Sequence, residues 1–251
     1  MRFPSSETGI TSPRRYGEQM SSSRYTSRGQ AGLRFIAQRG LLKPLVWSLT
    51  SVRVYGRENL DNLKAPYIVV ANHSSHLDAP LIMGGLPREH TRYLASNAAA
   101  DYFFDVRWRR TLTQLFFNAF PVDRTGLRGH KSVARELLES GIPLLIFPEG
   151  GRSMSGSMAQ FKPGAAALSI SKGVPCLPVA LVGAYDAMPK GANWVRKGRP
   201  PVTVNIGRPM SAGDDEDAIA FSGRLTKEVQ ALCDEALERR EREDRARGKI
   251  N

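Results

Sequence analysis

Short apolar runs that alternate with longer segments of helical periodicity constrain the fold of this chain more than any other feature. Five of the runs read as buried strands: residues 67–72, 92–96, 144–147, 176–182 and 202–206. Three other segments have helical spacing: residues 129–140, 164–172 and 217–247. Strands that alternate with helices of this length are typical of α/β proteins. We therefore predict a single α/β domain with a mostly buried sheet flanked by helices on both faces, preceded by an N-terminal amphipathic helical segment.

The chain before the first of these runs divides into two parts. Residues 1–30 are rich in Ser and Arg and lack hydrophobic periodicity, which predicts a basic, disordered arm, although organelle transit peptides have a similar composition. Residues 31–52 place most of their apolar side chains on one helical face, and Pro44 is expected to kink or split this helix. The helix can pack on its own domain, lie in a membrane interface with Trp47 among the lipid headgroups, or do both.

The rest of the chain is expected to be one domain with a closing helix. Residues 53–212 contain all the predicted strands. Residues 213–251 contain a charged helix whose apolar positions, such as Leu225 and Val229, recur at helical spacing. We expect this helix to pack on the domain.

The charge balance favours anionic partners. The net charge is +12, and the first 50 residues carry half of it. Nucleic acid, an anionic membrane surface and phosphorylated substrates are all compatible with this surplus. Nucleic acid is the least favoured, because the chain has no recognisable base-reading module and only 8% aromatic residues. No apolar run is long enough to span a membrane, and two cysteines cannot form a disulfide framework.

Histidine and aspartate side chains follow the first predicted strand, in the sequence Asn72-His73-Ser-Ser-His76-Leu-Asp78. Chemistry in α/β sheets gathers where strands end and helices begin. Pro80 suits the first turn of a helix, so Asp78 is expected to be its N-cap. A carboxylate that binds one imidazole nitrogen leaves the other as a base. His73 can therefore be a general base held by Asp78, or the two can have only loop and capping roles.

The same residues allow a metal site as an alternative, because His73, His76 and Asp78 are all possible ligands. The other histidines, His90 and His130, lie in polar segments without a pattern, and no Cys-x-x-Cys spacing adds ligands. We therefore predict no metal.

Two further segments offer groups that bind anions. A short strand predicted after residue 119 ends near Arg124, whose guanidinium can hold a phosphate. A second segment reads Glu149-Gly150-Gly-Arg152 after a buried strand, where glycine lets backbone N–H groups approach a ligand closely. The alternative is a glycine-rich surface turn with a Glu–Arg pair. The segment lacks the Lys-Ser/Thr ending of a nucleotide phosphate loop, so it does not imply ATP.

Four blocks of this sequence resemble the glycerolipid acyltransferase family, typified by 1-acylglycerol-3-phosphate acyltransferases, and they occur in the family's order. The blocks are Asn-His-Ser-Ser-His-Leu-Asp at 72–78, Phe-Pro-Val-Asp-Arg at 120–124, Phe-Pro-Glu-Gly-Gly-Arg-Ser at 147–153 and Val-Pro-Cys-Leu-Pro-Val at 174–179. The resemblance covers roughly residues 50–210, so residues 53–212 are expected to be the acyltransferase domain.

The resemblance implies acyl transfer from a thioester, either acyl-CoA or acyl carrier protein, to a hydroxyl of a lysophospholipid in phospholipid biosynthesis. It implies 1-acylglycerol-3-phosphate as the acceptor and no cofactor besides the donor. His73 is then the general base and Asp78 orients it. The residues implied in acceptor binding are Arg124, Glu149, Gly150 and Arg152. A lipid acceptor also implies peripheral or monotopic association with the cytoplasmic side of a membrane whose surface is anionic, with organelle targeting left open.

Two departures from the family pattern bear on the acceptor. Gly151 stands where the family usually has Thr, a change that keeps the backbone amide. Residues 95–104 contain no Lys, whereas many members that use 1-acylglycerol-3-phosphate carry one there. A different lysolipid acceptor therefore remains an alternative. A nucleic-acid-binding protein and a metal-dependent hydrolase are the alternatives of other classes.

Overall fold

A seven-stranded mixed sheet forms the centre of the computed structural model, which describes residues 25, 27–99, 116–122 and 130–246. The strands are β1 (Ser51–Tyr55), β2 (Ile68–Ala71), β3 (Ala95–Ala99), β4 (Phe120–Val122), β5 (Leu144–Ile146), β6 (Cys176–Val182) and β7 (Pro201–Ile206). Their order is β1-β7-β6-β2-β5-β3-β4, and every neighbouring pair is parallel except β6 and β7. The carboxyl ends of β2 to β6 therefore meet at one edge of the sheet.

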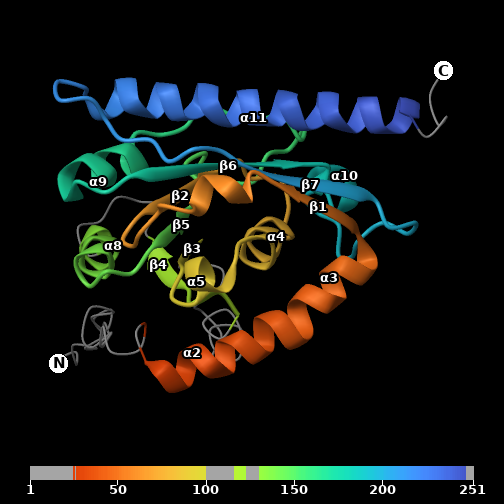
Figure 1. The fold of residues 1–251 in the computed structure, drawn as a ribbon, viewed down its shortest axis with the longest axis horizontal. Coiled ribbons are helices and arrows are strands. Elements are labelled where there is room, and N and C mark those ends of the chain that lie inside the picture. Colours follow the sequence, from red (N-terminus) through yellow and green to blue (C-terminus); the bar gives the residue numbers. More distant parts are fainter. Residues whose placement is uncertain (1–24, 26, 100–115, 123–129, 247–251) are drawn as a thin grey trace, which may run out of the picture.

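Helices cover both faces of this sheet (Figure 1). They are α2 (Arg28–Phe35), the π-helical η1 (Ile36–Leu42), α3 (Lys43–Leu49), the 3-10 helix η2 (Arg57–Leu60), α4 (Asp78–Gly85), α5 (Arg88–Thr91), α8 (His130–Glu139), α9 (Gly164–Lys172), α10 (Ala184–Ala187) and α11 (Ala218–Ala246). Helix α11 lies along one face, whereas α2, α3, α4 and α5 lie on the other.

The hydrophobic core has one part on each face because successive side chains of a strand point in opposite directions. In β2, Val69 packs in a cluster with Leu81 of α4, whereas Val70 packs in a second cluster with Val229 of α11. All four residues of β2 are buried. The predicted α/β fold with a sheet covered on both faces is confirmed.

Strand β1 was not predicted, and the start of β3 was predicted too early in the chain. The helix predicted to reach residue 52 ends at Leu49, because Thr50 adopts an extended conformation (φ −132°) and Ser51 begins a strand that pairs with β7. Only half-buried residues make up this edge strand, so it lacks the apolar run used to find the others. Strand β3 begins at Ala95 and not at residue 92, because the Arg92 N–H still bonds the Arg88 carbonyl of α5 (2.9 Å).

The helix is not split at Pro44 as predicted: Leu42 and Lys43 both keep helical backbone angles, and the irregularity is a wider helical segment before the proline. Pro44 lies in the first turn of α3, directly after the seven π-helical residues of η1. Proline cannot donate to the preceding turn and crowds its carbonyl group, which a π-helical segment accommodates. No helix in the described part of the chain is both long and apolar enough to cross a bilayer.

Candidate active site

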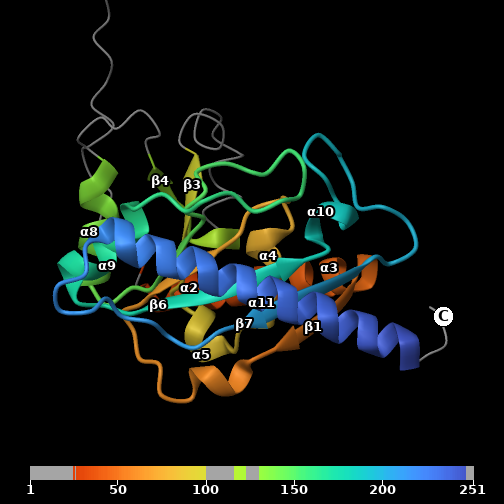
Figure 2. The ribbon, with the colours of Figure 1, turned by 90° about the horizontal axis from the view of Figure 1, so that it is seen from above.

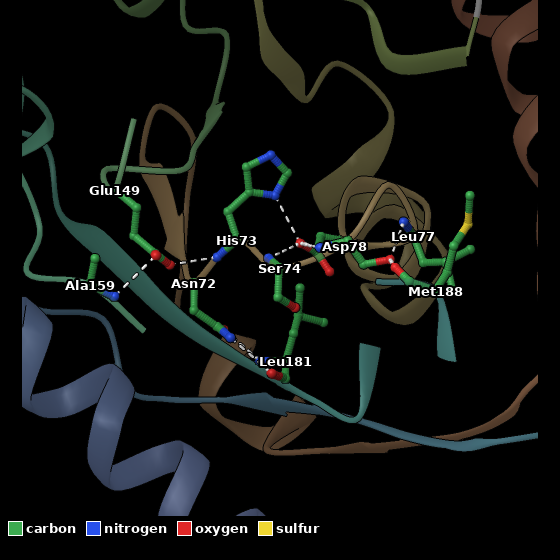
Figure 3. Close-up of polar contacts among 10 residues, drawn as sticks. Asn72, His73, Ser74, Leu77, Asp78, Glu149, Ala159, Leu181 and Met188 are labelled. Atoms are coloured by element: carbon green, nitrogen blue, oxygen red, sulfur yellow. Dashed lines mark hydrogen bonds and ion pairs between the residues drawn. The ribbon is translucent and has the colours of Figure 1, made fainter. Parts of the chain in front are cut away.

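The loop between β2 and α4 places His73 at the carboxyl edge of the sheet (Figure 3). Asn72, the first residue after β2, holds this loop to the neighbouring strand β6. Its side-chain amide donates to the Leu181 carbonyl (2.9 Å), and its carbonyl oxygen accepts from the Leu181 N–H (2.8 Å). Such a two-bond contact fixes the chain immediately before His73. The sequence analysis gave Asn72 no role, because the pairing depends on β2 and β6 being neighbours.

Asp78 holds the imidazole of His73, as Figure 3 shows. The His73 Nδ1 atom lies 2.8 Å from Asp78 Oδ2, and the Asp78 side chain is fully buried. The same oxygen accepts the backbone N–H groups of Ser74 (2.7 Å) and Ser75 (2.8 Å). Because an ionised carboxylate only accepts hydrogen bonds, Nδ1 carries the proton and Nε2 is left to act as a base.

Asp78 does not cap α4 as predicted. Leu77 occupies the N-cap position, and Asp78 is the first residue of the helix. Its carboxylate instead turns back to the amides of the preceding loop, Ser74 and Ser75. The carboxylate thereby shapes the loop that carries His73 and orients the ring at the same time.

Phe147 fixes the plane of the His73 ring. The two rings are stacked, with centroids 4.1 Å apart and planes 18° from parallel. Phe147 is almost completely buried, so its ring is a rigid surface for the imidazole. Sequence reasoning did not assign Phe147 a role, although its place directly after β5 was a signal, because β5 is the strand next to β2.

Glu149 ties His73 to a loop on its other side. Its Oε1 accepts the His73 N–H (2.7 Å), and its Oε2 accepts the Ala159 N–H (3.1 Å). Burial raises the pKa of Glu149, and these two backbone hydrogen bonds oppose the rise. The contact of Glu149 with an acceptor hydroxyl stays a prediction.

The turn after Glu149 is built on glycine and packs against the loop that carries His73. Gly150 adopts a φ of +78°, so its backbone conformation disfavours any side chain, and the flexible Lys162 Nζ lies near the position that a Cβ atom would take. Beyond the turn, the Ser153 N–H donates to the His73 carbonyl (2.8 Å). Both backbone polar groups of His73 are therefore bound by the segment from Glu149 to Ser153.

Arg152 supplies a positive charge next to this loop. Its Nη1 atom is buried and lacks a hydrogen-bond partner among the described residues, which suits it to bind an incoming anion. Partial burial lowers the pKa of His76, and the charges of Arg152 and His73 lower it further. The next residue, Ser153, bonds the His73 carbonyl, so Arg152 lies beside the loop that carries His73. Arg124, its predicted partner, lies outside the described residues.

The metal alternative finds no support in the described ranges, where no group of three potential ligands comes together. The Tyr67 hydroxyl donates to the backbone carbonyl of His90 and also lies within hydrogen-bonding distance of the His90 Nδ1 atom. In the structure, the Nδ1 of His73 is bound to Asp78.

The sequence is similar to a known family and to several curated proteins. The family model described as "Acyltransferase" matches residues 51–182. A 1-acyl-sn-glycerol-3-phosphate acyltransferase of Chlamydomonas reinhardtii is 32% identical over 66% of this chain and 49% of its own length. One of Cocos nucifera is 30% identical over 69% of this chain and 54% of its own. The chain thus spans about half the length of these curated relatives.

A solved structure is similar over most of the chain. The crystal structure of the 1-acyl-sn-glycerophosphate acyltransferase PlsC from Thermotoga maritima superimposes with a TM-score of 0.61 at 26% identity. The match covers 84% of this chain and 85% of that one.

Proposed function

This chain belongs to the acyltransferase family, and we propose that it transfers a fatty acyl group from a thioester to a hydroxyl of a lysophospholipid. The observation that carries this proposal is the buried Asp78 carboxylate on Nδ1 of His73, together with Arg152 Nη1, which has no hydrogen-bond partner among the described residues. In this arrangement, His73 would take the proton of a hydroxyl and Arg152 would bind a phosphate. The acceptor we favour is 1-acylglycerol-3-phosphate, for which the relatives from Chlamydomonas and Cocos are named.

In the proposed mechanism, His73 Nε2 removes the proton of the acceptor hydroxyl as the oxygen attacks the thioester carbonyl carbon. Asp78 stabilises the imidazolium that forms. Collapse of the tetrahedral intermediate breaks the C–S bond, and the imidazolium returns its proton to the departing thiolate. Binding both substrates beside each other supplies a further part of the acceleration. Acyl-CoA and acyl carrier protein both provide the thioester that this chemistry needs.

The two cysteines do not suit an alternative mechanism through an acyl-enzyme. Cys176 and Cys233 are buried in the core on the α11 face of the sheet. Burial raises the pKa of both thiols to about 12, and thiolate is the nucleophilic form of cysteine. Direct attack by the acceptor hydroxyl therefore fits the chain better.

Incubation of the purified protein with radiolabelled acyl-CoA or acyl carrier protein and a panel of acceptors tests the function. We expect labelled product with 1-acylglycerol-3-phosphate and little with acceptors that lack a phosphate monoester. Transfer to another lysolipid in preference would assign a different acceptor. Absence of labelled product with every donor and acceptor would reject the proposal.

Replacement of Arg152 by Ala should raise the KM for the phosphate-bearing acceptor about 10–100-fold and change kcat little. Hydrogen bonds to charged groups contribute about 1.5–3 kcal/mol, and a group that binds ground and transition states alike acts on KM. Arg152→Lys retains the charge without the paired donors, so its acceptor KM should lie between those of the parent chain and Arg152→Ala. An unchanged acceptor KM in steady-state kinetics of Arg152→Ala would remove this residue from the phosphate site.

We further infer that the N-terminal helix contacts the cytoplasmic face of a membrane, because buried polar side chains help to hold it to the domain while several of its apolar side chains are exposed. Arg34 and Gln38 are buried and donate to backbone carbonyls of the domain, at Arg92 and Phe116. The apolar side chains on the outside are exposed: Leu33 by 57%, Ile36 by 66%, Leu41 by 61% and Leu45 by 43%. An apolar face turned outward beside basic residues suits a peripheral or monotopic interfacial helix.

The inner side of this helix packs on the domain, which is the other interpretation that the sequence allowed for residues 31–52. Val46 is buried in the core, and a Cβ atom at Gly84 would collide with the Trp47 ring. Trp47 therefore packs on α4, and the prediction that it lies among lipid headgroups is not supported. The two interpretations describe opposite sides of one helix.

The triple variant Leu33→Ser/Ile36→Ser/Leu41→Ser should bind lipid vesicles about 100-fold more weakly than the parent chain. Burying most of a large aliphatic side chain contributes on the order of 1 kcal/mol or more, and the three contributions combine. A matched control is Ile170→Ser/Ile219→Ser/Leu237→Ser, which alters three exposed side chains on α9 and α11. Equal losses in both variants, measured by vesicle sedimentation, would contradict the role of the helix.

A further inference from the structure

Two loops beside the catalytic loop carry exposed apolar side chains, and we call them the rim: residues 153–158 and 189–199. Met154 is 72% exposed and Trp194 is 64% exposed. Among the described residues, most other large apolar side chains with comparable exposure lie on the N-terminal helix. Single exposed apolar residues are ordinary, but their position around one site needs a cause.

Hydrogen bonds connect the rim to His73 and its neighbours. The Ser153 N–H donates to the His73 carbonyl (2.8 Å), and the Tyr185 hydroxyl donates to the Met154 carbonyl (2.8 Å). Just before the second rim loop, the Met188 carbonyl accepts from the Ser75 hydroxyl (2.7 Å). The rim therefore borders the loop that holds the catalytic base.

The fold itself turns Trp194 outward. Its neighbour Val195 is buried in the core, and the Arg196 N–H donates to the Ala187 carbonyl (2.8 Å), which closes the second rim loop at its base. Val195 is buried and Trp194 exposed, so this closed loop holds Trp194 on its solvent side. The exposure of this tryptophan is a built feature of the loop.

The second rim loop is also basic. Lys190, Arg196 and Lys197 are exposed, and Asp186 is the sole acidic residue in the sequence from 184 to 208. Tryptophan next to lysine and arginine is the composition that proteins place at the headgroup layer of a membrane. An acidic carrier protein would match the cations but gives no reason for exposed Met154 and Trp194.

The rim is continuous with the helix that we assign to the membrane. The Arg199 guanidinium donates to the carbonyls of Trp47 (3.1 Å) and Thr50 (3.4 Å) at the end of α3. Figures 1 and 2 both show the chain between α10 and β7 beside this end of α3. In Figure 2 the same segment rises at the edge of the molecule where β3 and β4 end.

We propose that the rim docks on the headgroup layer of an anionic bilayer, so that a lysophospholipid reaches His73 directly from the membrane. Trp194 and Met154 enter the boundary between headgroups and acyl chains, and Lys190, Arg196 and Lys197 contact lipid phosphates. This inference rests on the proposed function, since it supplies the route of the lipid acceptor. It adds a second membrane contact, at the mouth of the active site, to that of the N-terminal helix.

Tryptophan fluorescence with vesicles of phosphatidylglycerol and phosphatidylcholine tests the insertion without any substrate. We expect a blue shift of the full chain on binding, and loss of most of it in Trp194→Phe, which retains Trp47 and Trp108. A full shift in Trp194→Phe, or bound protein without a shift, would overturn the proposal. Because no turnover is measured, failure of the proposed function would leave this readout intact.

The charge component is tested with Lys190→Ala/Lys197→Ala against Lys227→Ala/Arg242→Ala, which removes the same charge from exposed positions on α11. We expect about 30-fold weaker binding of the rim variant to the anionic vesicles and little change in the control. Equal binding of the two variants would overturn the proposal. So would unchanged vesicle binding of the rim variant with a raised KM for an acyl carrier protein, which would assign the surface to the donor.

Discussion

His73→Ala is expected to lower the rate of acyl transfer by about 10²–10⁴-fold, the range that a positioned general base contributes. Without the imidazole, no group at the end of β2 can take the hydroxyl proton from the position that Asp78 and Phe147 define. Substrate binding should survive, because the predicted phosphate ligand Arg152 is untouched. The loss should therefore fall on kcat, measured with both substrates saturating.

The fold should persist in this variant. Asp78 retains two backbone donors when the imidazole is removed, and Glu149 and Ser153 bind the backbone of residue 73 and not its side chain. Thermal unfolding of the variant checks this point. Imidazole added to the assay should restore part of the rate, as expected for a missing base and not for a damaged fold. A rate within threefold of the parent chain would show that His73 is not the base.

The residues of the active site differed in how far the sequence could predict them. His73 and Asp78 were predictable because they lie five residues apart, at the two ends of a turn that can join them. The stacking of Phe147 and the pairing of Asn72 with Leu181 depend on which strands are neighbours. Strand order is a property of the whole sheet and does not follow from spacing along the chain.

The N-terminal helix shows a second limit. Its periodicity places apolar residues on a helix, and the same pattern is compatible with packing inward or facing a membrane. Burial of Arg34 and Gln38 shows which side of the helix faces the domain, and both side chains donate to backbone carbonyls of segments more than 50 residues away. Backbone acceptors leave no trace in the residue types of the sequence. The orientation of this helix could therefore be read only from the structure.

The strand β1 was missed for a different reason. Its sequence Ser-Val-Arg-Val-Tyr alternates polar and apolar residues, which is the pattern of a half-buried edge strand. Its first residues also continue the helical periodicity of the preceding segment, where Val52 fits the apolar face equally well. When a short segment fits both a helical and an extended periodicity, the strand that it pairs with decides its structure, and here that strand is β7.

Asp78→Asn is expected to lower kcat by about 10²–10⁴-fold while the loop before α4 keeps its shape. The amide oxygen of Asn can take the place of Oδ2 and still accept the N–H groups of Ser74 and Ser75. The negative charge that stabilises the imidazolium is lost, however. In the other orientation the amide nitrogen would donate to Nδ1 and impose the wrong tautomer, with the proton on Nε2.

Asp78→Ala separates the two functions of this carboxylate. Here the buried amides of Ser74 and Ser75 lose their acceptor, at about 1–3 kcal/mol each, so the free energy of unfolding should fall by roughly 2–6 kcal/mol. Activity should be lost in both variants, whereas chemical denaturation should show a large loss of stability in the alanine variant alone. Equal stability of the two variants would mean that the loop does not depend on Asp78. An active asparagine variant would mean that the charge on Asp78 does not serve the proton transfer by His73. Residue 78 would then act only by holding the His73 ring in place.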